Sequence, residues 1–130
     1  MKPEVVTIGL GYIGLPTSAL IADNNISVLG IDINENVVNT INSGKIDTVE
    51  PDLDKIVYKV VSQKKFKAST KIESGKVYLI VVPTPFKENF EPDISFVEDA
   101  VKKITPFLNF DDLIIIESTS PVGTTEKMQQ

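Results

Sequence analysis

The sequence contains no cysteine and no histidine among its 130 residues. The absence of cysteine excludes disulfides and thiolate metal sites in this chain. The absence of histidine removes the usual general base and the commonest metal ligand. No apolar run approaches the roughly 20 residues of a membrane-spanning helix. The first residues, MKPEVV, also lack the apolar core of a secretory signal, so we expect a cytoplasmic protein with no membrane partner.

Charge of one sign is also not concentrated anywhere in the chain. Acidic residues outnumber basic ones by 18 to 13, which gives a net charge of -5, and neither sign forms a long block. This distribution argues against nucleic acid as the main partner. A hydrophobic content of 42% fits one globular domain with a substantial core.

Short apolar runs rich in Val and Ile recur along the chain. Four strong runs and a weaker one cover residues 5–10, 27–32, 77–82, 113–118 and 66–69. Continuous rather than alternating apolar residues are typical of strands that are buried on both faces, as in a parallel sheet.

Helical periodicity separates these runs. Apolar stripes predict helices over residues 53–61 and 94–104, and shorter helices are expected near 13–24 and 35–43. Alternating strands and helices predict an α/β fold with a doubly wound, mainly parallel sheet.

Two helix boundaries are also suggested by single residues. Pro51 suits the first position of the helix over 53–61. Another helix is expected to begin near the end of the chain, with Thr124 or Thr125 as its cap.

Gly9, Gly11 and Gly14 form the pattern G-x-G-x-x-G between the first predicted strand and the first predicted helix. In this context the pattern is specific for a dinucleotide-binding loop. Gly9 would permit a tight turn, Gly11 would let a pyrophosphate approach the backbone, and Gly14 would let the helix pack closely. Pro16 fits a helix that starts here, because proline lacks an N–H and the first N–H groups of a helix have no intrahelical acceptor. The alternative is a purely structural tight turn.

Asp32 ends the second predicted strand, roughly 20 residues after the loop, where a carboxylate accepts hydrogen bonds from the adenosine ribose. The 2′-phosphate of NADP would be repelled there, and the following INEN offers no arginine, so the sequence predicts NAD. Alternatively, Asp32 serves only as a turn or cap residue.

Polar residues also follow the later predicted strands, where ligands of open α/β sheets gather. Thr84, between two prolines, offers a hydroxyl to a cofactor ribose or lies in a rigid solvated turn. Ser118 and Thr119 place hydroxyls near a reacting centre or satisfy local backbone groups. Glu50, before Pro51, is more simply a partner of a helix dipole.

Together these motifs resemble the UDP-glucose/GDP-mannose dehydrogenase family over nearly the whole chain. The matching segments are TIGLGYIGLP (7–16), GIDIN (30–34), VEPDL (49–53), VPTPF (82–86) and ESTSPVGTTEKM (117–128). Within the family, VEPDL and the segment from VPTPFK to EPD look most like the branch that acts on UDP-N-acetyl-D-mannosamine.

The resemblance implies a Rossmann-type NAD-binding domain and oxidation of the C6 alcohol of a nucleotide sugar to a carboxylate, with two NAD consumed, for polysaccharide biosynthesis. Carried over residue by residue, it implies that the backbone at Tyr12 and Ile13 contacts the pyrophosphate and that Asp32 contacts the ribose. Thr84 would contact the cofactor. Thr119 would contact the cofactor and position a water near the reacting carbon.

The family's catalytic cysteine, with its lysine and asparagine partners, would lie beyond residue 130. We therefore expect residues 1–130 to be the NAD-binding domain at the amino end of a longer enzyme, without the central and UDP-sugar-binding domains and cut before the last strand of the sheet. Such a chain would bind NAD without turning over a sugar. The complete enzyme is expected to be a homo-oligomer that binds a UDP-sugar.

Other functions stay open on the sequence alone. The parent enzyme would instead oxidise UDP-glucose or UDP-N-acetylglucosamine, or it would be another Rossmann dehydrogenase whose downstream acid/base includes histidine. A non-catalytic module that senses a dinucleotide is the alternative from a different class.

Overall fold

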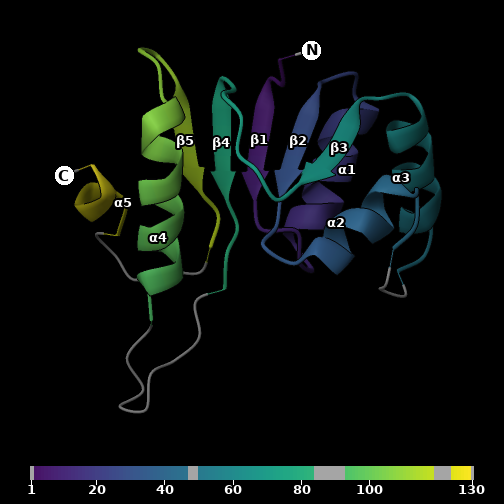
Figure 1. The fold of residues 1–130 in the computed structure, drawn as a ribbon, viewed down its shortest axis with the longest axis horizontal. Helices are drawn as coiled ribbons and strands as arrows, with labels where there is room; N and C mark the ends of the chain where they lie inside the picture. The colour runs from purple at the N-terminus through teal and green to yellow at the C-terminus, as the bar shows by residue number, and fades with distance from the viewer. Residues whose placement is uncertain (1, 47–49, 84–92, 119–123, 130) are drawn as a thin grey trace.

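The computed structural model describes residues 2–46, 50–83, 93–118 and 124–129. Its centre is a sheet of five parallel strands in the order β3-β2-β1-β4-β5 (Figure 1). The strands are β1 (Val5–Ile8), β2 (Val28–Ile31), β3 (Phe66–Ser69), β4 (Val77–Ile80) and β5 (Leu113–Ile116). The α/β class, the parallel sheet and all five predicted strands are confirmed, although each of the four strong apolar runs extends beyond its strand.

Helices cover both faces of the sheet (Figure 1). They are α1 (Gly14–Asp23), α2 (Glu35–Asn42), α3 (Leu53–Ser62), α4 (Ser95–Ile104), the 3-10 turn η1 (Thr105–Phe107) and α5 (Thr124–Met128). One apolar core joins the sheet to α1, α2 and α3, and the other joins it to α4 and α5. Within the described ranges, no helix has the length and apolar character needed to cross a bilayer.

The strand order reverses direction between β1 and β4. The chain builds β1, β2 and β3 outward to one edge, then crosses back to place β4 on the other side of β1. Such a reversal opens a crevice at the carboxyl ends of the strands, where open α/β sheets bind ligands. Here that point lies directly after Ile8 and Ile80.

The two edge strands differ in how they are protected. At β3, the side-chain amide of Asn42 donates to the Ala68 carbonyl at 2.8 Å and accepts from the Ala68 N–H at 2.9 Å. It thus supplies the two hydrogen bonds that a neighbouring strand would make. At β5, by contrast, Leu113 and Ile115 are 53% and 38% exposed. They lie on the same face of the sheet as α1, which packs on the more central strands.

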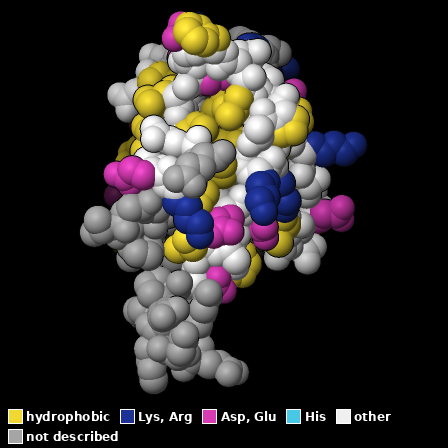
Figure 2. Space-filling view, turned by 90° about the vertical axis from the view of Figure 1, so that its left-hand side faces the viewer, with side chains coloured by type: hydrophobic (Ala, Val, Ile, Leu, Met, Phe, Trp, Pro, Cys, Tyr) yellow, Lys and Arg dark blue, Asp and Glu magenta, His cyan; other side chains and the backbone are white. Residues whose placement is uncertain are grey.

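The face formed by α4 and α5 carries charges of both signs. Lys127 of α5 pairs with Glu98 of α4 at 3.0 Å, and Lys102 and Lys103 lie in the last turn of α4. In the view of Figure 2, basic and acidic side chains are interspersed around apolar patches. Among its described residues, this face therefore carries no basic stripe of the kind that tracks a nucleic-acid backbone.

Two helix starts differ from the sequence-based predictions. Pro51 is not the first residue of α3, because Asp52 adopts a left-handed backbone with φ of 67° and the helix begins at Leu53. A single left-handed residue interrupts helical geometry, so Pro51 stays outside the helix. The last helix begins at Thr124 itself, so neither Thr124 nor Thr125 precedes it as a cap.

Replacing Asn42 with Leu should lower the free energy of unfolding by about 1–3 kcal/mol, because two backbone groups of the β3 edge lose their partner. Urea unfolding followed by circular dichroism measures the change. Asn39→Leu, at an exposed position one turn earlier in α2, is the matched control and should change stability by less than about 0.5 kcal/mol. Equal effects of the two substitutions would contradict the edge-protecting role.

Candidate functional site

The glycine loop lies at the reversal point and is packed against the chain that leaves β4. Gly9 has a φ of 104°, and a Cβ built there would lie 2.4 Å from the carbonyl oxygen of Val81. A Cβ on Gly14 would lie 1.9 Å from the carbonyl oxygen of Gly9. Both glycines are therefore required by the fold, the first by backbone conformation as well as space.

Gly11 differs from its two neighbours in the motif. A Cβ built at Gly11 would meet no protein atom within 4 Å, and its φ lies outside the left-handed range. Neither packing nor backbone conformation therefore explains a glycine at this exposed position. The open space above Gly11 fits a ligand that must come close to the backbone.

The loop also presents unused hydrogen-bond donors. Among the described residues, none accepts a hydrogen bond from the backbone N–H groups of Gly11, Tyr12 or Ile13, all of which are exposed. The helical bonding of α1 starts at Leu15, whose N–H donates to the Gly11 carbonyl at 3.1 Å. Free donors at the positive end of a helix form an anion-binding site.

Asp32 follows β2 directly and faces the glycine loop. One carboxylate oxygen accepts a hydrogen bond from the Leu10 N–H at 3.1 Å, and the other accepts from the Asn34 N–H at 3.0 Å. The turn role considered for Asp32 is therefore present in the structure. Each oxygen keeps a further lone pair, and the side chain is only partly buried, so the carboxylate can still accept hydrogen bonds from a ribose.

An apolar residue beside Asp32 was not singled out from the sequence. Ile33 is 84% exposed although it is a large aliphatic residue, and Tyr12 on the glycine loop is 79% exposed. Exposed apolar side chains at a ligand crevice suit the flat face of a base. The sequence signal that could have identified Ile33 is its position as the single apolar residue in the otherwise polar stretch DINEN.

The residues after β4 and β5 are described only in part. The Ser118 hydroxyl donates to the Ile80 carbonyl at 3.2 Å, which is the backbone-satisfying alternative considered for it. Thr84 and Thr119, both predicted to contact the cofactor, lie outside the described residues. Glu50 is exposed three residues before α3, and its carbonyl accepts from Leu53.

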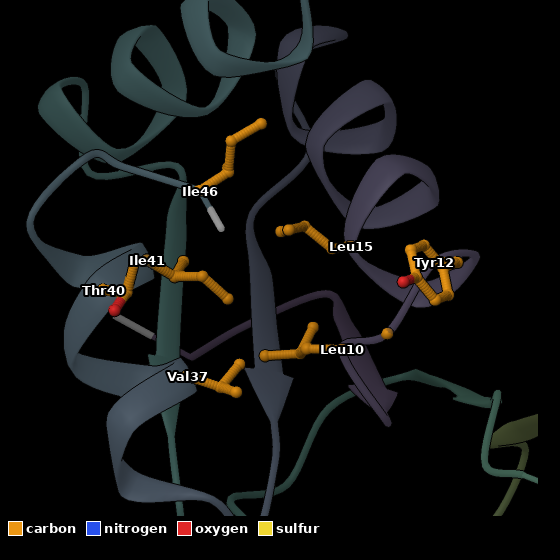
Figure 3. A pocket seen from close by; sticks show the side chains of 8 residues that line it. Leu10, Tyr12, Leu15, Val37, Thr40, Ile41 and Ile46 are labelled. Atoms are coloured by element: carbon orange, nitrogen blue, oxygen red, sulfur yellow. The ribbon is translucent and has the colours of Figure 1, made fainter. Parts of the chain in front are cut away.

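An apolar hollow lies next to the loop, between α1 and α2 (Figure 3). Its volume is about 140 Å³, and side chains of Leu10, Leu15, Val37 and Ile41 point toward it, whereas Tyr12 lies to one side. Gly11, Tyr12 and Thr40 also line it, so the lining is mainly but not wholly apolar. The hollow therefore adjoins the part of the loop that carries the N–H donors.

Comparison with known proteins identifies the chain's family. The model of the UDP-glucose/GDP-mannose dehydrogenase family, NAD binding domain, matches residues 3–130. The chain belongs to this family. Its cofactor is accordingly NAD, as the acid at the end of β2 predicted.

Two curated relatives and one solved structure illustrate the similarity. The chain is 53% identical to a UDP-N-acetyl-D-mannosamine dehydrogenase of Yersinia pestis over 97% of its length. It is 49% identical, over 95% of its length, to an NDP-N-acetyl-D-galactosaminuronic acid dehydrogenase of Ralstonia nicotianae. The UDP-N-acetyl-mannosamine dehydrogenase structure from Staphylococcus aureus superimposes with a TM-score of 0.91 at 40% identity over 94% of this chain.

The chain spans only about 30% of the length of these relatives, namely 30% and 29% of the two curated proteins and 30% of the solved chain. The family membership therefore concerns the NAD-binding domain.

The glycines of the loop should differ sharply in their tolerance of a methyl group. Gly14→Ala places a Cβ against the Gly9 carbonyl and should lower the free energy of unfolding by about 3 kcal/mol or more. Gly11→Ala meets open space and should stay within about 0.5 kcal/mol of the unaltered chain. Urea unfolding of both variants checks this order, and a strongly destabilised Gly11→Ala would contradict the open geometry.

Proposed function

We propose that the amides of Gly11, Tyr12 and Ile13 hold the pyrophosphate of NAD and that Asp32 holds its adenosine ribose. The observation that carries the proposal is the set of three exposed N–H donors without acceptors in the described chain, next to a glycine that neither packing nor conformation requires. Backbone donors suit a diphosphate because they bind its charge without a lysine or arginine.

The surroundings of Asp32 support the choice of NAD over NADP. All 13 basic residues of the chain are lysines, so no arginine is present to pair with a 2′-phosphate. Glu35, in the first turn of α2, adds a second negative charge nearby in the chain. Ile33 offers an aliphatic surface to the adenine ring on the same turn.

We infer that the complete protein is a nucleotide-sugar 6-dehydrogenase that converts UDP-N-acetyl-D-mannosamine to the corresponding uronate. The bound NAD supplies the hydride acceptor. The residues of this chain bind the cofactor, orient it at the carboxyl ends of β1 and β4, and hold Asp32 in place through Leu10 and Asn34. Thr84 would contact the cofactor, and Thr119 would contact it and position a water.

The curated relatives named above support this substrate class, and their names also include an N-acetylgalactosaminuronate enzyme at similar identity. By the family resemblance, the complete enzyme would be a cytoplasmic homo-oligomer whose product enters polysaccharide synthesis.

The cofactor assignment predicts two separable effects, one on NAD affinity and one on the preference for NAD over NADP. Gly11→Ala should remain folded yet bind NAD about tenfold or more weakly, because its methyl group holds the phosphate away from the amide donors. Asp32→Asn should reduce the preference for NAD over NADP by at least about tenfold, because the repulsion of a 2′-phosphate is removed. Isothermal titration of each variant with NAD and NADP measures both effects.

Asp54→Asn, which removes an exposed negative charge from the first turn of α3, is the control for the change of net charge and should alter neither affinity. Unchanged NAD binding in Gly11→Ala, together with unchanged selectivity in Asp32→Asn, would remove these residues from the site.

The substrate assignment is tested in a protein of the relatives' full length that carries this chain. With saturating NAD, it should form two NADH per UDP-N-acetylmannosamine, because oxidation of an alcohol to a carboxylate removes four electrons. The comparison sugars are UDP-N-acetylgalactosamine, UDP-N-acetylglucosamine, UDP-glucose and GDP-mannose. Faster turnover of one of these sugars would make it the substrate in place of UDP-N-acetylmannosamine. No NADH from any of the five sugars would favour a dinucleotide-sensing role.

A further inference from the structure

Two hydroxyl groups are buried together beneath the glycine loop. Thr7 and Ser18 are both 0% exposed, and among the described residues they are the only buried side chains with a polar group apart from the phenol of Tyr78, which lies in the core of the other sheet face. The Ser18 hydroxyl donates to the Thr7 hydroxyl oxygen at 2.8 Å. Everything else in the core of this sheet face is apolar, so the pair is a localised polar contact.

The pair joins the two elements that flank the loop. Thr7 lies in β1, two residues before Gly9, and Ser18 lies in α1, one turn after Gly14. Thr7 is aligned with Gly30 and Leu79 on the neighbouring strands, which places its side chain on the face that α1 covers. The hydrogen bond thus connects the strand that enters the loop to the helix that leaves it.

Apart from the close contact of Gly14 with the Gly9 carbonyl at its first residue, the packing between α1 and the sheet provides little to fix the position of the helix along its axis. Apart from Leu15, the buried residues of α1 are small: Gly14, Ser18, Ala19 and Ala22. Small side chains allow close approach but form shallow ridges, which resist sliding poorly. A hydrogen bond is directional and short-ranged, so it selects one position where small apolar groups accept several.

The energetics of the pair point the same way. A buried hydrogen bond between two hydroxyls contributes little net stability, because both groups lose water on folding. Replacing both partners with apolar groups of the same shape is often close to neutral. The pair therefore contributes more to geometry than to stability.

We propose that Thr7 and Ser18 are positioning residues for the pyrophosphate-binding loop. Their hydrogen bond holds the amino end of α1 at the position along the sheet that directs the amides of Gly11, Tyr12 and Ile13 toward the cofactor. This inference rests on the function proposed for those amides. Neither hydroxyl contacts the ligand. Their effect is exerted through the helix, and sites of this kind tolerate displacements of only about 0.5 Å.

The double variant Thr7→Val/Ser18→Ala tests the proposal, because it removes both hydroxyls without leaving one unpaired. Its melting temperature should stay within about 5 °C of the unaltered chain. Its NAD dissociation constant should rise roughly 5- to 10-fold as the amide–phosphate hydrogen bonds lengthen. In the ligand-free state, the ¹⁵N–¹H resonances of Gly11, Tyr12 and Ile13 should shift, which a merely structural role would not cause.

Ser62→Ala, which removes a hydroxyl at the exposed end of α3, is the control and should leave both NAD affinity and these resonances unchanged. Thr7→Ser keeps the hydroxyl and should retain NAD affinity within about twofold, whereas Ser18→Ala should not. These two single variants decide the question if the double variant does not fold.

The proposal is overturned if the double variant, or Ser18→Ala when the double variant does not fold, binds NAD as tightly as the unaltered chain with unshifted loop resonances. Failure of the unaltered chain to bind NAD is a different result. It would reject the cofactor role proposed for the loop amides, while the ligand-free resonances would still decide whether the hydroxyl pair sets the loop's position.

Discussion

The structure depends on one close approach, in which strand, turn and helix meet at the glycine loop. Gly14 lies so near the Gly9 carbonyl that a Cβ would stand 1.9 Å from it, and Gly9 in turn lies against Val81 at the end of β4. These contacts bring the start of α1 onto the carboxyl ends of β1 and β4. Any larger residue at Gly9 or Gly14 would push the helix away from the reversal point of the sheet.

The binding properties of the loop follow from this constraint. The N–H groups of Gly11, Tyr12 and Ile13, which directly precede α1, have no acceptor among the described residues, and these three residues are exposed. The carboxylate of Asp32 bonds to the Leu10 N–H and so connects β2 to the same loop. The tight turn after β1 thereby places N–H groups without acceptors in the described chain beside the carboxylate that follows the adjacent strand β2.

Much of the fold was predictable because its signals are local. The apolar runs located all five strands, and the stripe over 53–61 located α3, since a buried strand and an amphipathic helix each leave a periodic pattern. The start of α3 was not predictable, because Pro51 favours a helix start while Asp52 takes a left-handed conformation that no nearby residue signals. The side-chain bonds from Asn42 to Ala68 join residues far apart in the sequence.

The sequence by itself determined the cofactor class, because dinucleotide binding needs glycines at fixed spacing in the turn and an acidic residue at the end of the next strand, and both can be recognised along the chain. Only the tertiary structure distinguished Gly11, which faces open space, from Gly9 and Gly14, which are confined by neighbouring backbone. It alone also brought Thr7 to Ser18 and Asp32 to Leu10. Those contacts join residues of different elements, and their distances are set by the packing of helices on the sheet rather than by any pattern along the chain.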